Sequence, residues 1–262
     1  MNVWTLVGLG LNASIFGMAI AWFVGRRLKN AGYIEACWPF VFALVVALYA
    51  SVGAGAPFRR MTIAIIVSLW ALRLGSYLVT RVARHHSVED LRYQQLREQF
   101  PKRPWHMFFG FSQLQAGLVG ILSVPLVIAC SNPAPTFSTL ELAALALWFI
   151  AWIGEIIADS QLDRFRKQAD NAGKVYSGGL WRFSRHPNYF FEWLIWVAYF
   201  LFALAAPGGW FSVYVPLLML LLLTSVTGIP ATEVRALLTR GASYEAYQRR
   251  TSAFVPWFPR RG

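Results

Sequence analysis

The chain has 262 residues, of which 57% are hydrophobic and only 14% charged, with a mean hydropathy of +0.47. A soluble domain carries roughly 25% charged residues, so this surplus of apolar side chains requires an apolar solvent and excludes an ordinary soluble protein. The 24 Lys and Arg residues against 12 Asp and Glu residues give a net charge of +12. Because the basic residues stand in short loops between apolar runs, they favour membrane topology and anionic lipid over nucleic acid, and we expect no nucleic-acid partner.

Seven apolar runs are long enough to cross the hydrocarbon core of a bilayer, which takes about 20 helical residues. A helix satisfies its own backbone hydrogen bonds in lipid, so each run predicts a transmembrane helix. The first run lacks the basic segment that opens a signal peptide, and we expect it to be retained. The runs lie near Val3–Val24, Tyr33–Gly53, Thr62–Thr80, Phe108–Ala129, Leu140–Ile157, Tyr189–Ala206 and Trp210–Gly228. The expected fold is an all-α integral membrane protein of seven transmembrane helices, forming one membrane domain over residues 1–262.

The distribution of Lys and Arg predicts the orientation of these helices. The loops after the first, third and fifth helices and the C-terminal tail hold 21 of the 24 basic residues. Arg59 and Arg60 lie on the other side, and Arg73 lies inside the third helix. The positive-inside rule therefore places the N-terminus outside and the C-terminus in the cytoplasm. Arginine far outnumbers lysine, as in GC-rich bacterial genomes, so we expect a bacterial inner membrane, or the endoplasmic reticulum if the source is eukaryotic.

The densest polar segment is Tyr176–Glu192, which runs directly into the sixth predicted helix. Gly178–Gly179 permits a tight turn and a close backbone approach, and Arg182 and Arg185 offer forked donors that suit a phosphate. His186 precedes a helix start, where free N–H groups favour an anion. The alternative is a basic loop that only fixes membrane orientation, but so many polar groups within one short segment favour a binding site.

The end of the fifth predicted helix carries a second polar group of residues. If the helix continues into the cytosol, Glu155, Asp159, Leu162 and Arg166 share one face, because they are spaced by three or four residues. Asp159 and Arg166 would then face the same cavity as the Gly-Gly segment. The alternative is an amphipathic turn at the interface with ordinary ion pairs.

Charged residues also occur in or near the second and third predicted helices. Glu35 and Arg73 indicate function, because an intramembrane charge is costly and usually faces a cavity or a partner. Tyr77 lies one helical turn from Arg73, and Trp38 and Trp70 are positioned to wall an apolar pocket. The alternative for Glu35 is an interfacial position.

The tail offers two tyrosines three residues apart, Tyr244 and Tyr247, followed by Arg249 and Arg250. These residues could close over a bound nucleotide, and the alternative is a surface helix. The His and Cys residues show no metal-ligand spacing, so we expect no metal.

The segments Gly154–Arg166 and Gly178–Glu192, together with the Tyr-x-x-Tyr and Phe-x-Pro patterns of the tail, resemble the steroid 5α-reductase-like membrane reductases, especially their bacterial members. The resemblance covers the C-terminal half well and the N-terminal half loosely. An Arg-His-Pro-x-Tyr…Glu pattern also occurs in isoprenylcysteine carboxyl methyltransferases, which bind S-adenosylmethionine, and such a methyltransferase is the alternative. The Asp-x-x-Leu-x-x-x-Arg pattern followed by Gly-Gly-Leu favours the reductases. A non-catalytic lipid- or sterol-binding protein is a third hypothesis.

The resemblance implies NADPH bound from the cytosolic side and a lipidic enone, such as a 3-oxo-Δ4 steroid, entering from the membrane. We expect a monomer. Loops at about 81–107 and 158–188 and the tail 229–262 would form the cofactor site. Glu35 matches the catalytic glutamate of the family, with Tyr77 or Trp70 as its partner. Trp38, Trp70 and Arg73 would contact the substrate. The expected NADPH-binding residues are Asp159, Arg166, Lys174, Gly179, Arg182, Arg185, His186, Asn188, Tyr189, Glu192, Tyr244, Tyr247 and Arg250.

The implied chemistry explains these residue types. Hydride addition to the β-carbon of an enone builds negative charge on the carbonyl oxygen, and one well-placed donor contributes about 3 kcal/mol to the stabilisation of that charge. A glutamate kept protonated in a low-dielectric pocket is such a donor. Arginines near the nucleotide favour NADPH over NADH, because the additional phosphate needs partners.

Overall fold

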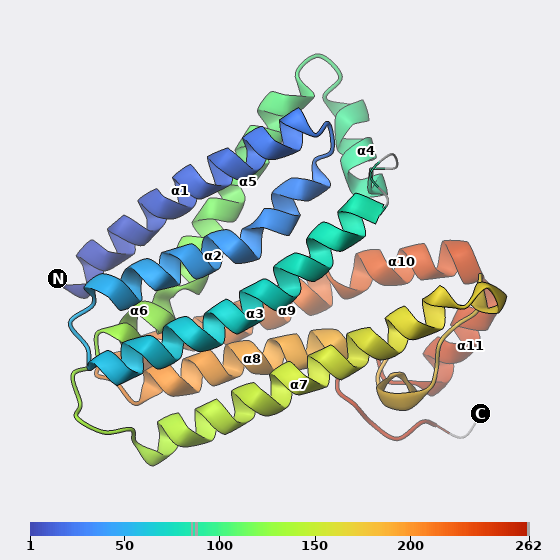
Figure 1. The fold of residues 1–262 in the computed structure, drawn as a ribbon. Helices are drawn as coiled ribbons and strands as arrows, with labels where there is room; N and C mark the ends of the chain where they lie inside the picture. Colours follow the sequence, from blue (N-terminus) through green and yellow to red (C-terminus); the bar gives the residue numbers. More distant parts are fainter. Residues whose placement is uncertain (85, 87–88, 261–262) are drawn as a thin grey trace. The chain divides into compact units, whose positions relative to one another are not determined.

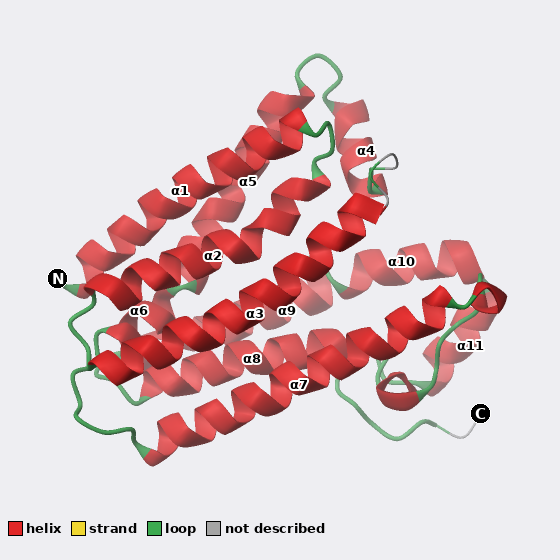
Figure 2. Cartoon of the chain, viewed as in Figure 1, coloured by secondary structure: helices red, strands yellow, loops and turns green. Residues whose placement is uncertain are grey.

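The computed structural model describes the whole chain except residues 85, 87–88 and 261–262, so part of the predicted loop 81–107 lies outside the described residues. Helices dominate the described chain (Figures 1 and 2), and an isolated bridge pairs Ser184 with Ser252. The expected all-α class is confirmed. The α-helices are α1 (Val3–Arg27), α2 (Gly32–Val52), α3 (Pro57–Arg84), α4 (Leu91–Gln99), α5 (Pro104–Leu122), α6 (Val124–Cys130), α7 (Thr139–Lys167), α8 (Pro187–Leu204), α9 (Tyr214–Leu221), α10 (Ile229–Arg240) and α11 (Ala242–Arg250).

Six helical segments of the described chain are long and apolar enough to cross a membrane: α1, α2, α3, α7, α8 and the segment Gly209–Arg240. The pair α5 and α6 makes a seventh if it counts as one span, bent by 42°. Pro125 at the start of α6 explains the bend, because proline lacks the N–H that would continue the α5 hydrogen bonds. The chain is therefore an all-α integral membrane protein, and the predicted run Phe108–Ala129 corresponds to the bent pair.

The chain divides into two compact units. Unit 1 comprises Met1–Phe137 with Ala206–Gly209, and unit 2 comprises Ser138–Ala205 with Trp210–Gly262. Each unit is described by itself below.

In unit 1, α2 packs against both α1 and α3, and α1 also packs against α5. Small residues permit this close packing. A Cβ atom on Gly10 would lie 1.9 Å from the Tyr49 hydroxyl, and one on Gly75 would lie 2.4 Å from the Phe40 ring. Glycine is common where membrane helices approach each other closely, because dispersion between the helices replaces the hydrophobic effect.

Arg59 at the start of α3 is completely buried, although its position suggested an ordinary loop residue outside the membrane. Its guanidinium donates to the carbonyl oxygens of Asn132, Ala134 and Thr136 at 3.1, 2.8 and 2.7 Å. These bonds satisfy the charge, so Arg59 ties the loop after α6 to α3.

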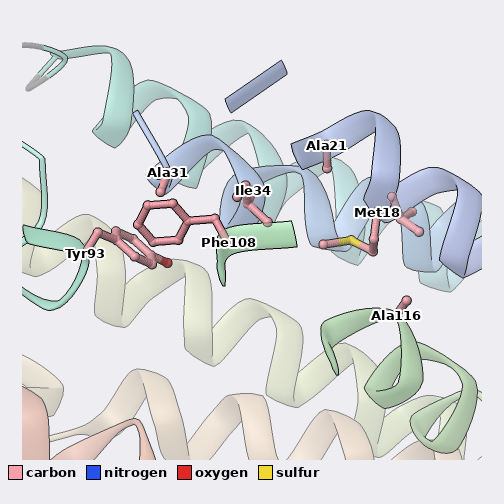
Figure 3. Packing of buried hydrophobic residues seen from close by; sticks show 8 residues of the cluster. Met18, Ala21, Ala31, Ile34, Tyr93, Phe108 and Ala116 are labelled. Carbon is pink, nitrogen blue, oxygen red and sulfur yellow. The ribbon is translucent and has the colours of Figure 1, made fainter. Parts of the chain in front are cut away.

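A buried cluster joins the short helix α4 to the long helices of unit 1 (Figure 3). Tyr93 of α4 lies against Phe108 of α5, with ring centroids 6.0 Å apart. Other members of the cluster are Met18, Ala21, Ala31, Ile34, Val41 and Ala116. Because α4 is only nine residues long, this packing is what holds it in place.

In unit 2, α7 and α8 form an antiparallel pair (Figure 1). A Cβ atom on Gly154 would lie 2.5 Å from the Phe191 ring, so glycine permits the close approach of the two helices. The C-terminal end of α7 and the N-terminal end of α8 therefore lie at the same end of unit 2, where the polar segment connects them.

Candidate functional site

Two residues predicted to bind the cofactor meet between α7 and α8. The side-chain N–H of Asn188 donates to Oδ1 of Asp159 at 3.1 Å. The amino group must face the carboxylate, because two oxygens would repel, and this leaves Asn188 Oδ1 buried without a hydrogen-bond partner in the described chain. A buried acceptor without a donor costs about 1–3 kcal/mol. Asn188 thus offers an acceptor for a ligand that carries a hydroxyl or amide N–H.

The Gly-Gly segment forms a tight turn held by α7. Gly179 has a φ of +52°, which glycine adopts without strain, and a Cβ atom there would lie 2.5 Å from the Gln161 side chain. Gln161 accepts a hydrogen bond from the backbone N–H of Leu180 at 3.0 Å. The indole N–H of Trp181 donates to the Ala158 carbonyl at 2.9 Å. The turn therefore lies against the last turns of α7, close to the helical position of Asp159.

Glu233 of α10 is the centre of a polar network in unit 2. Its carboxylate lies 2.7 Å from Nε of Arg185 and 3.2 Å from Nε2 of His186. The Gln248 amide donates to the other carboxylate oxygen at 2.9 Å. Arg185 also donates to the backbone carbonyls of Gln248 and Thr251 at 3.0 and 2.7 Å. The network fixes the segment before α8 to α10 and α11.

Arg185 and His186, which were both predicted to bind the cofactor, have protein partners in this network. The Arg185 and His186 side chains are only 11% and 3% exposed, and their hydrogen bonds go to protein groups. The Arg185 guanidinium is hydrogen-bonded to one carboxylate and two carbonyls, and it positions the polar segment. Tyr189 stacks on His186 with ring centroids 5.4 Å apart, and its hydroxyl lies 3.2 Å from that of Thr232.

The two tail tyrosines are buried in unit 2. The Tyr247 hydroxyl donates to the backbone carbonyl of Trp181 and lies 3.3 Å from the carbonyl oxygen of Ser184, and its ring lies 5.8 Å from that of Tyr244. Burial raises the pKa of Tyr244 to about 12 and also raises the pKa of Tyr247. Both phenols are therefore neutral at physiological pH, and they join α11 to the Gly-Gly turn.

The remaining predicted cofactor residues differ in exposure. Glu192 is buried and accepts a hydrogen bond from the Trp196 indole at 2.8 Å. The basic residues of this group are exposed and lie in or beside the segments that carry the network: Arg166, Lys174, Arg182 and Arg250. Their side chains supply positive charge at the polar end of unit 2, where a phosphate-bearing ligand would need it.

In unit 1, Glu35 meets a residue that the sequence did not single out. The Tyr93 hydroxyl donates to Oε2 of Glu35 at 2.9 Å. Glu35 is half-buried in the first turn of α2, and Tyr93 is only 3% exposed. The sequence predicted Tyr77 or Trp70 as the partner of Glu35. The structure adds Tyr93, held in the cluster of Figure 3, as a phenol that contacts the carboxyl directly.

A second carboxylate holds Tyr93 at this position. Glu89 accepts a hydrogen bond from the backbone N–H of Ala31 at 2.6 Å, at the N-terminus of α2, and forms an ion pair with Arg97 at 2.6 Å. A carboxylate suits this position, because the free N–H groups at a helix start favour negative charge. Glu89 thereby fixes α4 against α2. Tyr93 and Glu35, which lie four residues after Glu89 and Ala31, then meet.

The predicted substrate residues Trp38 and Trp70 form an aromatic group with Phe42. Trp38 and Trp70 meet edge to face at 6.0 Å, and Phe42 lies 5.5 and 5.6 Å from them. Trp70 is completely buried, whereas Arg73 and Tyr77 are half-buried on α3. The two tryptophans are therefore together in unit 1, as expected of one apolar wall.

Sequence reasoning assigned no role to Tyr93, Glu233 or Gln161. Tyr93 lies in a nine-residue helix within a segment predicted as a loop, and a helix this short shows little periodicity. Glu233 carried a weak signal, because it is one of two acidic residues in a basic tail. Gln161 carried none, since its role depends on a turn 18 residues away.

The fold and these sites define a class: an all-α integral membrane protein with buried polar groups at helix ends. A family described as "Protein of unknown function (DUF1295)" matches residues 21–251, and the chain belongs to this family. The chain is also similar to an uncharacterised protein of Schizosaccharomyces pombe, with 27% identity over 222 residues, covering 76% of this chain and 64% of that relative. The chain thus spans less than two thirds of the length of that relative. No solved structure matches this chain significantly.

Proposed function

We propose that this protein is an NADPH-dependent reductase that transfers a hydride to the C=C bond of a lipidic enone, such as a 3-oxo-Δ4 steroid. The observation that carries the proposal is the hydrogen bond between Tyr93 and Glu35. A carboxyl held by a phenol is a proton-donating pair, which the reduction of an enone requires. Methyl transfer to a carboxylate requires no proton donor, so this pair favours the reductase over the methyltransferase.

Unit 1 supplies the groups for the substrate in this proposal. NADPH, when bound, would supply the hydride for the β-carbon. The electron pair of the C=C bond would then lie on the enolate of the substrate, and a proton from solvent would complete the α-carbon. Glu35, when protonated, donates to the enone oxygen, and Tyr93 fixes the rotation of the carboxyl so that it donates in one direction. One such donor accelerates the reaction by roughly 10²–10³-fold. Trp38 and Trp70 supply the apolar wall.

Unit 2 supplies the groups for the nucleotide. Its polar segment fits such a ligand, because Asn188 Oδ1 is a buried acceptor without a partner in the described chain, and the ribose hydroxyls and the carboxamide of NADPH are donors. Asp159 lies beside it and also accepts hydrogen bonds. The exposed Arg166 and Arg182 supply charge for the phosphates, and Arg185 acts through the Glu233 network as a positioning residue.

The orientation proposed is the one that the basic residues favour, with the N-terminus outside and the polar end of unit 2 in the cytoplasm. This end combines Arg164, Arg166 and Lys167 in the last turn of α7 with Arg182 and Arg185 before α8. The membrane would be a bacterial inner membrane, or the endoplasmic reticulum in a eukaryote. A C-terminal fluorescent-protein fusion should fluoresce in the cytoplasm, and an alkaline phosphatase fusion at the same position should be inactive.

Cofactor binding by the purified full-length protein tests the function. We expect NADPH to raise the thermal unfolding temperature, with NADH raising it less and S-adenosylmethionine having no effect. Asn188→Ala should weaken the NADPH shift. Glu35→Gln should retain the shift and lose at least 100-fold in the rate of enone reduction, whereas Glu98→Gln, an exposed glutamate of α4, should retain both.

Each of the other outcomes identifies another function. Stabilisation by S-adenosylmethionine in place of NADPH would support the methyltransferase. No stabilisation by either nucleotide would refute both enzymes and favour a lipid-binding protein.

A further inference from the structure

The C-terminal tail, residues 251–260, returns to the polar segment that precedes α8. The Ser184 hydroxyl donates to the Phe254 carbonyl at 2.8 Å, and the backbone N–H of Trp257 donates to the Phe183 carbonyl at 2.9 Å. The Phe254 ring packs against two aromatic rings of α8 at 5.7 and 5.9 Å. The tail is therefore fixed to the start of a candidate membrane span.

The length of α8 sets the depth of the tail in the membrane. Its 18 residues extend about 27 Å at 1.5 Å per residue, which is slightly less than the thickness of a hydrocarbon core of about 30 Å. If α8 crosses the bilayer, Pro187 must lie at the edge of the hydrocarbon. Phe183, four residues earlier, lies at the level of the headgroups, and Trp257 is hydrogen-bonded to it at the same level.

The tail and α11 enclose a cleft of about 440 Å³. Basic and apolar side chains line it together, and no acidic residue does. The arginines Arg249, Arg250 and Arg260 are exposed, and in the part of the chain that the structure describes no ion pair engages them. Trp257 and Phe258 also line the cleft and are 70% and 77% exposed.

Exposed arginines beside exposed aromatic side chains are costly in water and favourable at a lipid surface. Large aromatic side chains gain free energy at the headgroup level, and arginine pairs with phosphate through its forked donors. A second copy of the chain would bring the same positive charge to the cleft, which disfavours self-association there. An acidic soluble protein would leave the aromatic side chains without an apolar environment.

We propose that this cleft binds the headgroup phosphate of an anionic phospholipid, with Trp257 and Phe258 at the boundary between headgroups and acyl chains. Arg249 and Arg260 contact the phosphate, and the aromatic pair anchors the tail beside α8. The bound lipid belongs to the membrane in which the protein resides, and the cleft selects it by charge.

Lipid titration of the purified full-length protein in a neutral detergent tests this proposal, with native mass spectrometry as the readout. We expect phosphatidylglycerol to bind more tightly than phosphatidylcholine of the same acyl chains. Each arginine near an anionic lipid surface contributes about fivefold in affinity, so the double variant Arg249→Gln with Arg260→Gln should lose about 25-fold for phosphatidylglycerol. Trp257→Ala combined with Phe258→Ala should weaken the binding of both lipids.

Arg164→Gln is the matched control, because Arg164 is exposed at the same end of unit 2 but does not line the cleft. It should bind both lipids as the unmodified protein does, and inorganic phosphate should not displace phosphatidylglycerol. Equal affinity for the two lipids, a loss in Arg164→Gln as large as in the tail variant, or displacement by inorganic phosphate would each overturn the proposal. The NADPH thermal shift of the same variants distinguishes a loss of lipid binding from a loss of the nucleotide binding that the proposed reductase activity requires.

Discussion

Replacing Glu233 with glutamine tests whether the carboxylate network holds unit 2 together. Glu233 and Arg185 form an ion pair in which the side chains are 16% and 11% exposed, and removing one partner of a fully buried pair costs about 3–5 kcal/mol. Arg185 retains two carbonyl acceptors in the variant, so we expect a smaller loss of about 2–3 kcal/mol in the free energy of unfolding. The glutamine keeps one carbonyl acceptor, so its NH2 group faces either Arg185 and His186 or Gln248, and that side loses its acceptor. This mismatch keeps the loss well above that of a surface charge.

The assay is thermal unfolding of the full-length protein in detergent, followed by tryptophan fluorescence. At about 2–4 °C per kcal/mol, Glu233→Gln should lower the Tm by roughly 5–10 °C. Glu245→Gln removes an exposed glutamate of the neighbouring helix α11 and should shift the Tm by less than about 2 °C. Arg185→Gln combined with Glu233→Gln should cost less than the sum of the two single changes, because both remove the same interaction. Equal Tm values for Glu233→Gln and the unmodified protein would refute the stabilising role of the network.

Three further predictions follow from other contacts. Tyr93→Phe should lower the rate of enone reduction by about tenfold with unchanged NADPH binding, because it removes the donor to Glu35. Gly179→Ala should lower the free energy of unfolding by about 1–2 kcal/mol, because alanine is strained at positive φ and its Cβ meets Gln161. Burial raises the pKa of Tyr244 to about 12, so the folded protein keeps this phenol neutral between pH 10 and pH 12 while the unfolded chain ionises it. The stabilisation is complete below pH 10 and declines by about 1.4 kcal/mol per pH unit up to about pH 12. The Tm of Tyr244→Phe should therefore decline less steeply over that range than the Tm of the unmodified protein.

A specific outcome would contradict each of these three predictions. A loss of NADPH binding in Tyr93→Phe would point to a structural defect rather than a lost donor. An unchanged Tm in Gly179→Ala would mean that the turn relaxes without cost, and parallel pH profiles for Tyr244→Phe and the unmodified protein would argue against a buried neutral phenol.

The sequence by itself determined the class of fold and one part of the candidate site. Runs of apolar residues are a local property, and lipid permits little besides helices, so the all-α membrane class follows without a tertiary structure. The resemblance to the membrane reductases implied that Asp159 and Asn188 both bind the cofactor. The structure brings them within 3.1 Å.

Only the tertiary structure decided which charges have partners within the protein. Arg185 has an ion-pair partner in Glu233, 48 residues away, which no local pattern indicates. Glu35 acquired a phenol partner from Tyr93, 58 residues away in a helix too short to be recognised by periodicity. The physical reason is the same in both cases: helical periodicity reports only the neighbours three and four residues apart, whereas the partner of a buried charge is selected by how distant segments pack.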